Sequence, residues 1–200
     1  MKNMEDRIKQ LFAASIEAKV AIIDPLLPLI AEAGVRLAKC LLNDGKILIC
    51  GNGGSAANCL HFSAAMISCY EVERPALPII ALNTDLSALT SVANNNHYDH
   101  IFARQINALA REGDLLLVLS TAGNTNNLLQ AIHAANDRGI DTIVLNGRDG
   151  GVLASHLGPE DLELRVQANN AAQIRELHLF ILHCFCDLIE QSLFGQMLEQ

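Results

Sequence analysis

The chain has 200 residues, of which 50% are apolar and 18% are charged, so it can bury one sizeable core. Its formal net charge of −8 argues against a protein that grips nucleic acid through the phosphates, because that mode of binding needs basic patches. The six cysteines are scattered and form no C-x-x-C pair, which indicates buried, reduced thiols rather than a disulfide scaffold.

The N-terminal segment predicts helices rather than a targeting signal. Acidic residues stand where a signal peptide would have its apolar core, and no apolar run approaches the roughly 20 residues that span a bilayer. Residues 5–42 show helical spacing of apolar side chains, but Pro25 and Pro28 interrupt it and predict that one helix ends and another begins. We therefore expect a cytoplasmic protein in which residues 1–43 form a helical hairpin used in oligomerisation.

Short apolar runs alternate with helical patterns over the rest of the chain. The runs at 46–50, 77–82, 114–120 and 141–147 are apolar on both faces, which is typical of parallel strands covered on both sides, and 161–166 supplies a fifth. Helical patterns lie between and after them, over Ser55–Tyr70, 85–111, 126–138 and 171–193. The alternation predicts an α/β fold, a single domain over 1–200 with a doubly wound, five-stranded parallel sheet flanked by helices.

Two strand-to-helix turns carry residues that suit an anion. Ligands of a parallel sheet bind at the carboxyl ends of the strands, where helix N-termini present free N–H groups. The first turn is "CGNGGSAAN", and the second is "STAGNTNN", which places hydroxyls and amides around Gly123. Taken alone, "GNGGS" could be a tight turn with an N-cap, and it matches neither a dinucleotide fingerprint nor a Walker loop. Two such turns at one sheet edge favour a phosphate site that needs no Lys or Arg.

With "IALNTD", "GRDGG" and "IRELHLFILHCFCDLIE", these turns resemble the sugar isomerase (SIS) domain family over nearly the whole chain. The likeness is closest to its phosphoheptose isomerase branch, which includes the DnaA initiator-associating (DiaA) proteins. The resemblance implies a homotetramer with a sugar-phosphate pocket between subunits. The residues expected in that pocket are Asn52, Gly53, Gly54, Ser55, Asn94, Asn95, Ser120, Thr121, Ala122, Asn124, Thr125 and Arg175.

The acid–base residues of the isomerases are only partly present. Moving a proton between neighbouring carbons of a sugar phosphate needs a general base and a general acid. In the isomerases, a histidine and a glutamate on one helix and a glutamine and a histidine on the last helix form this set, and in some members they hold zinc. The corresponding residues here are His61, Ala65, Arg175 and His183. Because the glutamate is missing, no catalytic residue is assigned, and because Arg175 is a cation, no metal or other cofactor is expected.

Two other residues of the last helix receive structural interpretations. Glu176 shares a helical stripe with His183 and could serve as a base, but we interpret it as a surface acid or an interface salt bridge. We interpret His178 as structural.

Three functions remain open. The "HFSAAMI" segment resembles the initiator-associating branch, so the leading hypothesis is a non-catalytic homotetramer that binds DnaA and promotes timely replication initiation, with a retained phosphosugar pocket. The alternative is a phosphoheptose isomerase that converts sedoheptulose 7-phosphate to D-glycero-D-manno-heptose 7-phosphate for lipopolysaccharide heptose biosynthesis, as His183 suggests. Zinc is expected only under this alternative. The third is a phosphosugar sensor with another partner. No direct contact with nucleic acid or membrane is expected.

Overall fold

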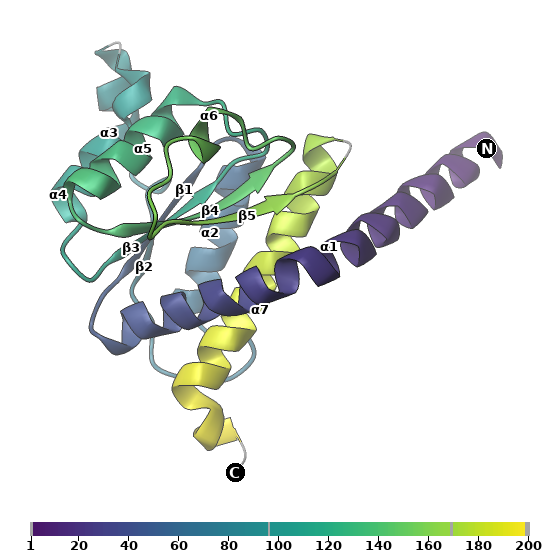
Figure 1. Cartoon of the computed structure of the whole chain (residues 1–200), viewed down its shortest axis with the longest axis horizontal. Coiled ribbons are helices and arrows are strands. Elements are labelled where there is room, and N and C mark those ends of the chain that lie inside the picture. The colour runs from purple at the N-terminus through teal and green to yellow at the C-terminus, as the bar shows by residue number, and fades with distance from the viewer. Residues whose placement is uncertain (1, 96, 169, 199–200) are drawn as a thin grey trace.

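The computed structural model describes residues 2–95, 97–168 and 170–198. Its centre is a five-stranded, all-parallel sheet with the order β2-β1-β3-β4-β5, which confirms the predicted fold class (Figure 1). The strands are β1 (Ile47–Gly51), β2 (Ile79–Ala81), β3 (Leu115–Leu119), β4 (Asp141–Gly147) and β5 (Leu162–Val166). Every residue of β1 and β3 is buried, as expected of central strands with helices on both faces.

Two layers of helices enclose the sheet, and each encloses its own apolar core. The first layer contains α1 (Lys2–Leu42), α2 (Gly54–Ile67) and α7 (Ala171–Leu198), packed on alternate strand residues such as Ile47 and Ile49. The second contains α3 (Leu86–Asn94), η1 (Tyr98–His100), α4 (Ala103–Leu109), α5 (Asn126–Asp137) and α6 (Gly151–Ala154), packed on the other face through residues such as Leu48. Because successive strand residues point to opposite faces, β1 contributes to both cores.

The N-terminal segment is one continuous helix, so the expected hairpin is wrong. Pro25 and Pro28 lie inside α1. Each proline removes a helical hydrogen bond, but Ile22 and Leu26 on one face are buried in the first core and hold the helix together across this stretch. Figure 1 shows α1 crossing α7, with its N-terminal half extending away from the rest of the chain.

The single helix expected over residues 85–111 is also wrong, because three short helical pieces, α3, η1 and α4, occupy this range. The Asp85 side chain caps the first piece by accepting the backbone N–H of Ala88 at 2.9 Å. A polar Asn and His stretch then separates α3 from η1. The break leaves this helical layer at the carboxyl edge of the sheet, beside the first predicted phosphate turn.

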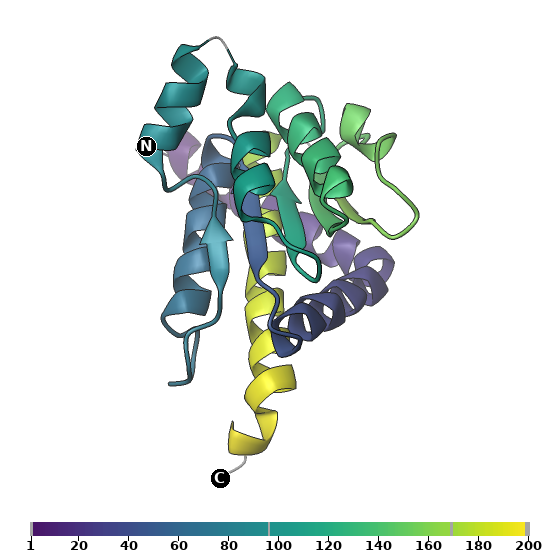
Figure 2. The same cartoon turned by 90° about the vertical axis from the view of Figure 1, so that its left-hand side faces the viewer.

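Helix α7 contains a long apolar segment. Its residues 171–195 are long and apolar enough, by length and composition alone, to cross a membrane, with a mean hydropathy of 1.3. That corrects the expectation that no segment reaches this threshold. Ile174, Leu177, Ile181 and Phe185 are nevertheless buried in the first core, which explains the composition as that of a core helix. The C-terminal end of α7 extends beyond the sheet (Figures 1 and 2).

Candidate active site

The two predicted phosphate turns meet at the carboxyl edge of the sheet. They follow β1 and β3, which are neighbours with Gly51 opposite Leu119. The side chains of Asn52 and Asn127 join the turns by two reciprocal amide hydrogen bonds, each 2.9 Å long. Asn127 is buried, so this pair is shielded from water and fixes the spacing between the turns.

The first turn exposes backbone N–H groups at the start of α2. Gly53 has a φ of 56°, in the left-handed region that favours glycine, and it caps α2 without a side-chain hydrogen bond. Ser55 follows within the first turn of the helix and is only 3% exposed as a residue. A serine hydroxyl beside free helix N–H groups is a suitable anion ligand.

The second turn is held in shape by its own polar side chains. The Ser120 hydroxyl accepts the backbone N–H of Gly123 at 2.9 Å, and the Asn124 side chain accepts the N–H of Val152 at 3.0 Å. Thr121 and Ala122 are half-buried, whereas Thr125 is exposed at the N-terminus of α5. Ser120 and Asn124 therefore shape the turn.

Arg175 lies against the first turn, at the N-terminal end of α2. A methyl group added to Gly54 would lie 2.6 Å from its Cδ and 2.7 Å from its Nε. The Arg175 carbonyl accepts the side-chain N–H of Asn58 at 2.9 Å, which joins α7 to α2 at this level. Arg175 was predicted to line the sugar-phosphate pocket, and the structure places its side chain beside Gly54 of the first turn.

His61 and His183 meet farther along the same pair of helices. Their Nε2 atoms are 2.9 Å apart, and their rings form an edge contact with centroids 5.1 Å apart. Burial, and then the neighbouring His61, lower the pKa of His183 below its usual value. With both rings neutral, one Nε2 carries the hydrogen and the other carries the lone pair.

The contact between Gly54 and Arg175 and the pair of His61 and His183 mark the two ends of a seam between α2 and α7. Gly54 and His61 are seven residues apart on α2, so at 1.5 Å per residue they lie about 10 Å apart along its axis. Arg175 and His183 occupy the same two levels on α7. The seam thus places a candidate anion site at one end and a histidine pair at the other.

A groove of about 630 Å³, which no sequence pattern indicated, opens beside His183. It contains Tyr70, whose ring centroid is 5.8 Å from that of His183, and the carboxylates of Glu71 and Asp187. Its remaining walls are mostly apolar side chains of α1 and α7, including Ile23 and Leu27. Acidic groups therefore share a cavity with His183 even though Ala65 carries none.

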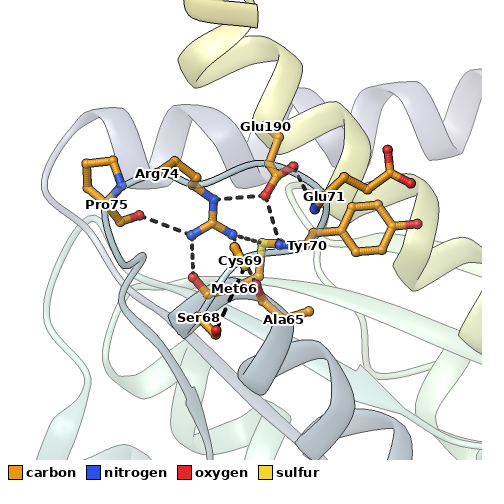
Figure 3. A network of polar contacts seen from close by, with 9 residues as sticks. All are labelled: Ala65, Met66, Ser68, Cys69, Tyr70, Glu71, Arg74, Pro75 and Glu190. Atoms are coloured by element: carbon orange, nitrogen blue, oxygen red, sulfur yellow. Dashed lines mark hydrogen bonds and ion pairs between the residues drawn. The ribbon is translucent and has the colours of Figure 1, made fainter.

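A buried ion pair fixes the segment that carries Tyr70 and Glu71 (Figure 3). The Arg74 Nε donates to Glu190 of α7 at 2.9 Å, and their side chains are 1% and 4% exposed. Glu190 also accepts the backbone N–H groups of Tyr70 and Glu71, at 3.1 and 3.4 Å. Arg74 in turn donates to the carbonyl oxygens at the end of α2, including that of Ala65. No sequence pattern pointed to this network, because Glu190 lies more than 100 residues from its other members.

Several predicted residues lie elsewhere or have structural roles. Asn94 and Asn95 are exposed at the end of α3, and Asn95 lines a separate hollow. Glu176 binds Ser15 and Lys19 of α1, each at 2.5 Å, and Lys19 and then Ser15 lower its pKa. The buried His178 contacts the Asn146 carbonyl at 3.0 Å, as a structural histidine would.

The residues at the family's zinc positions do not fit that metal. His61 and His183 could each supply a nitrogen, but Ala65 has no donor atom and Arg175 has only N–H groups. Within the described part of the chain, no group of three or more His, Cys, Asp or Glu side chains is arranged to hold a metal ion. The four positions therefore offer two nitrogen ligands and no oxygen ligand.

The five-stranded sheet, with the two candidate anion turns at its carboxyl edge, is the fold expected of a SIS domain, and the SIS domain family model matches residues 12–147. Within that class, the chain belongs to the phosphoheptose isomerase family. It is 53% identical over 190 residues to the phosphoheptose isomerase of Halorhodospira halophila, covering 95% of this chain and 96% of that protein. The phosphoheptose isomerase of Methylococcus capsulatus is 50% identical, with 97% and 100% covered. A solved phosphoheptose isomerase from Francisella tularensis superposes with a TM-score of 0.91 at 42% identity, over 94% of this chain and 98% of that one.

These relatives contradict the leading hypothesis from the sequence. The interpretation as a non-catalytic, DnaA-binding protein depended on Ala65 in place of the glutamate. Similarity over nearly the full length of several isomerases supports the alternative, an enzyme. The missing glutamate is thus a difference within an isomerase family and not a mark of another function.

Proposed function

We propose that this protein is a phosphoheptose isomerase that converts sedoheptulose 7-phosphate to D-glycero-D-manno-heptose 7-phosphate. The observation that carries the proposal is the identity of about half of all residues with phosphoheptose isomerases over 95% of the chain. The seam between α2 and α7 is consistent with it, since the anion site and the histidine pair are separated by about the length of an extended seven-carbon sugar phosphate. In this arrangement the phosphate lies at the two turns and the reacting carbons lie at the histidines.

The histidine pair can supply both proton-transfer groups. A base removes a proton from C1 of the ketose while an acid protonates the C2 oxygen, which gives an enediol; C2 then gains a proton and the C1 hydroxyl loses one. The lone pair on one imidazole and the N–H on the other satisfy each other in the free protein. When substrate separates them, one becomes the base and the other the acid. Glu71 and Asp187, which share the groove with His183, are further acidic groups at this end.

An assay of the purified protein tests the proposal. Incubation with sedoheptulose 7-phosphate, followed by NMR with and without added zinc, should show conversion to the aldose. Changing His183 or His61 to Ala should lower kcat by about 10²–10⁴-fold, the usual contribution of an acid or base. His97→Ala, an exposed histidine outside the seam, is the matched control and should leave kcat unchanged. Absence of turnover by the wild type would refute the proposal, and full activity of both active-site variants would refute the assigned acid–base pair.

We further propose that the working form is a homotetramer in the cytoplasm that binds a sugar phosphate between subunits. An exposed apolar stripe on α1 supports assembly, because large apolar patches on a surface mark contact sites. The stripe continues into the groove beside His183 through Ile23 and Leu27. Assembly would then close the reacting end of the seam.

A further inference from the structure

Arg175 occupies an electrostatically unfavourable place unless an anion joins it. Its side chain crosses Gly54, the first residue of α2, where the helix presents unpaired N–H groups and a partial positive charge. Cations are normally favoured at the opposite end of a helix. A guanidinium beside a helix N-terminus therefore places one positive charge next to another. A bound anion would stabilise both the guanidinium and the helix N-terminus.

The other half-buried arginines in the described residues all have partners. Arg36 binds Glu32, Arg74 binds Glu190, and Arg165 binds Glu163. The Arg175 guanidinium has five N–H donors, but no acceptor contacts them among the described residues. Half-burial without an acceptor leaves these donors to be satisfied by water or by a ligand at the first turn.

The two turns at this edge of the sheet carry donors of the kind that bind a phosphate. Ser55 follows Gly54 directly and is 3% exposed as a residue, and its Cβ lies next to the end of β1. The hydroxyl of Ser120 accepts a hydrogen bond from Gly123 and keeps its own hydrogen free to donate. A planar guanidinium can hold two phosphate oxygens at once, while the hydroxyls and helix N–H groups take the others.

We propose that Arg175 is the cationic ligand of the substrate phosphate, acting with the first turn and the hydroxyls of Ser55 and Ser120. The identity of the sugar in this inference rests on the proposed function; the anion site itself does not. The isomerase pattern has a neutral glutamine at this position, so Arg175 changes the role of the position from acid–base or metal chemistry to phosphate binding.

The test is a double-variant cycle on Arg175 and Gly54. Calorimetry in the presence of EDTA would measure the affinity for inorganic phosphate and for sedoheptulose 7-phosphate. Arg175→Gln should weaken both by about 10-fold or more, because a charge-assisted hydrogen bond is lost, and Arg175→Lys should restore part of the affinity. Gly54→Ala should also weaken binding, because its methyl group displaces the arginine. In the Arg175→Gln background the same methyl group should have little further effect.

Arg111→Gln is the matched control, because it removes the same charge from an exposed arginine at the amino edge of the sheet. It should bind both anions as the wild type does. Unchanged affinity in Arg175→Gln, or an equal loss in Arg111→Gln, would overturn the inference even if the wild type isomerises the heptose phosphate. Phosphate binding that depends on Arg175 without any turnover would support the inference and refute the proposed function. Should Arg175→Gln fail to fold, Gly54→Ala and Arg175→Lys give the same comparison.

Discussion

At the scale of single residues, the charge states of the histidines follow from where the helices place them. His183 is partly buried and faces His61, and both influences disfavour its cationic form. His178 is fully buried against the Asn146 carbonyl, and burial lowers its pKa to about 4. His183 lies at the proposed reacting end of the seam, whereas His178 packs in the core. Protonation of His183 should therefore affect activity, and protonation of His178 should affect stability.

Activity should fall on the acid side as His183 takes up a proton. Because its pKa lies below the usual value, His183 is neutral at pH 7 and loses its lone pair only at lower pH. His61→Gln removes the smaller of the two influences, so the pKa of His183 should rise toward its ordinary value but remain below it. NMR titration of the His183 ring in both proteins measures this shift. No movement in the variant would contradict the contact between the two rings.

Stability should fall in mild acid because of His178. Its folded pKa of about 4 lies below the ordinary value, so the unfolded chain binds more protons between these limits and stability decreases as pH falls through them. The loss at pH 5 is about 2 kcal/mol by linkage. Urea unfolding at pH 7.5 and pH 5 measures it. His178→Gln should flatten this dependence, whereas the exposed His97→Gln should keep it; the same slope in both variants would rule out His178 as the cause.

At the scale of elements, the buried ion pair between Arg74 and Glu190 decides where α2 ends. The sequence predicted a helix to Tyr70, but α2 ends at Ile67, and Arg74 binds the carbonyl oxygens of Ala65 and Met66. The segment that follows packs against α7 through Glu190. A local pattern could not predict this end, because the group that fixes it comes from a helix more than 100 residues away.

Breaking this pair should destabilise the protein strongly. Glu190→Met leaves the Arg74 charge buried without its carboxylate, which should cost about 3 kcal/mol or more of unfolding free energy. Arg74→Met should cost a similar amount, because the Glu190 carboxylate then loses its cation. The double variant Arg74→Met with Glu190→Met should be closer to the wild type than either single variant. Chemical denaturation tests this order, and strictly additive losses would argue against a coupled pair.

The sequence was sufficient for the elements whose signal is local. All five strands were placed to within two residues at each end, because buried parallel strands are continuous apolar runs between turns. The two predicted turns lie at one sheet edge, as their positions after neighbouring strands implied, but the contact between His61 and His183 was not predicted, because it depends on how α2 and α7 align. Glu71, Asp187 and Tyr70 were missed because an irregular segment and a helix face carry no periodic signal for a groove.

At the scale of the whole molecule, α1 connects assembly to the site. On its outer face a stripe of large apolar residues is between 48% and 69% exposed, comprising Ile8, Phe12, Ile16, Val20, Ile23 and Leu27. The inner face packs on α7 and carries the Ser15 and Lys19 contacts to Glu176. One helix therefore has one face committed to its own chain and another available for a second copy.

A charge placed on that stripe should dissociate the proposed tetramer and lower activity together. Phe12→Glu puts a carboxylate on the exposed apolar face, where burial in an interface would be costly. Gln10→Glu introduces the same charge two residues earlier, about 160° around the helix, and should leave assembly intact. Light scattering after size exclusion measures the mass, and the isomerase assay measures the rate. If assembly closes the groove beside His183, Phe12→Glu should lose kcat as it loses mass; a fully active monomer would show that each subunit holds a complete site.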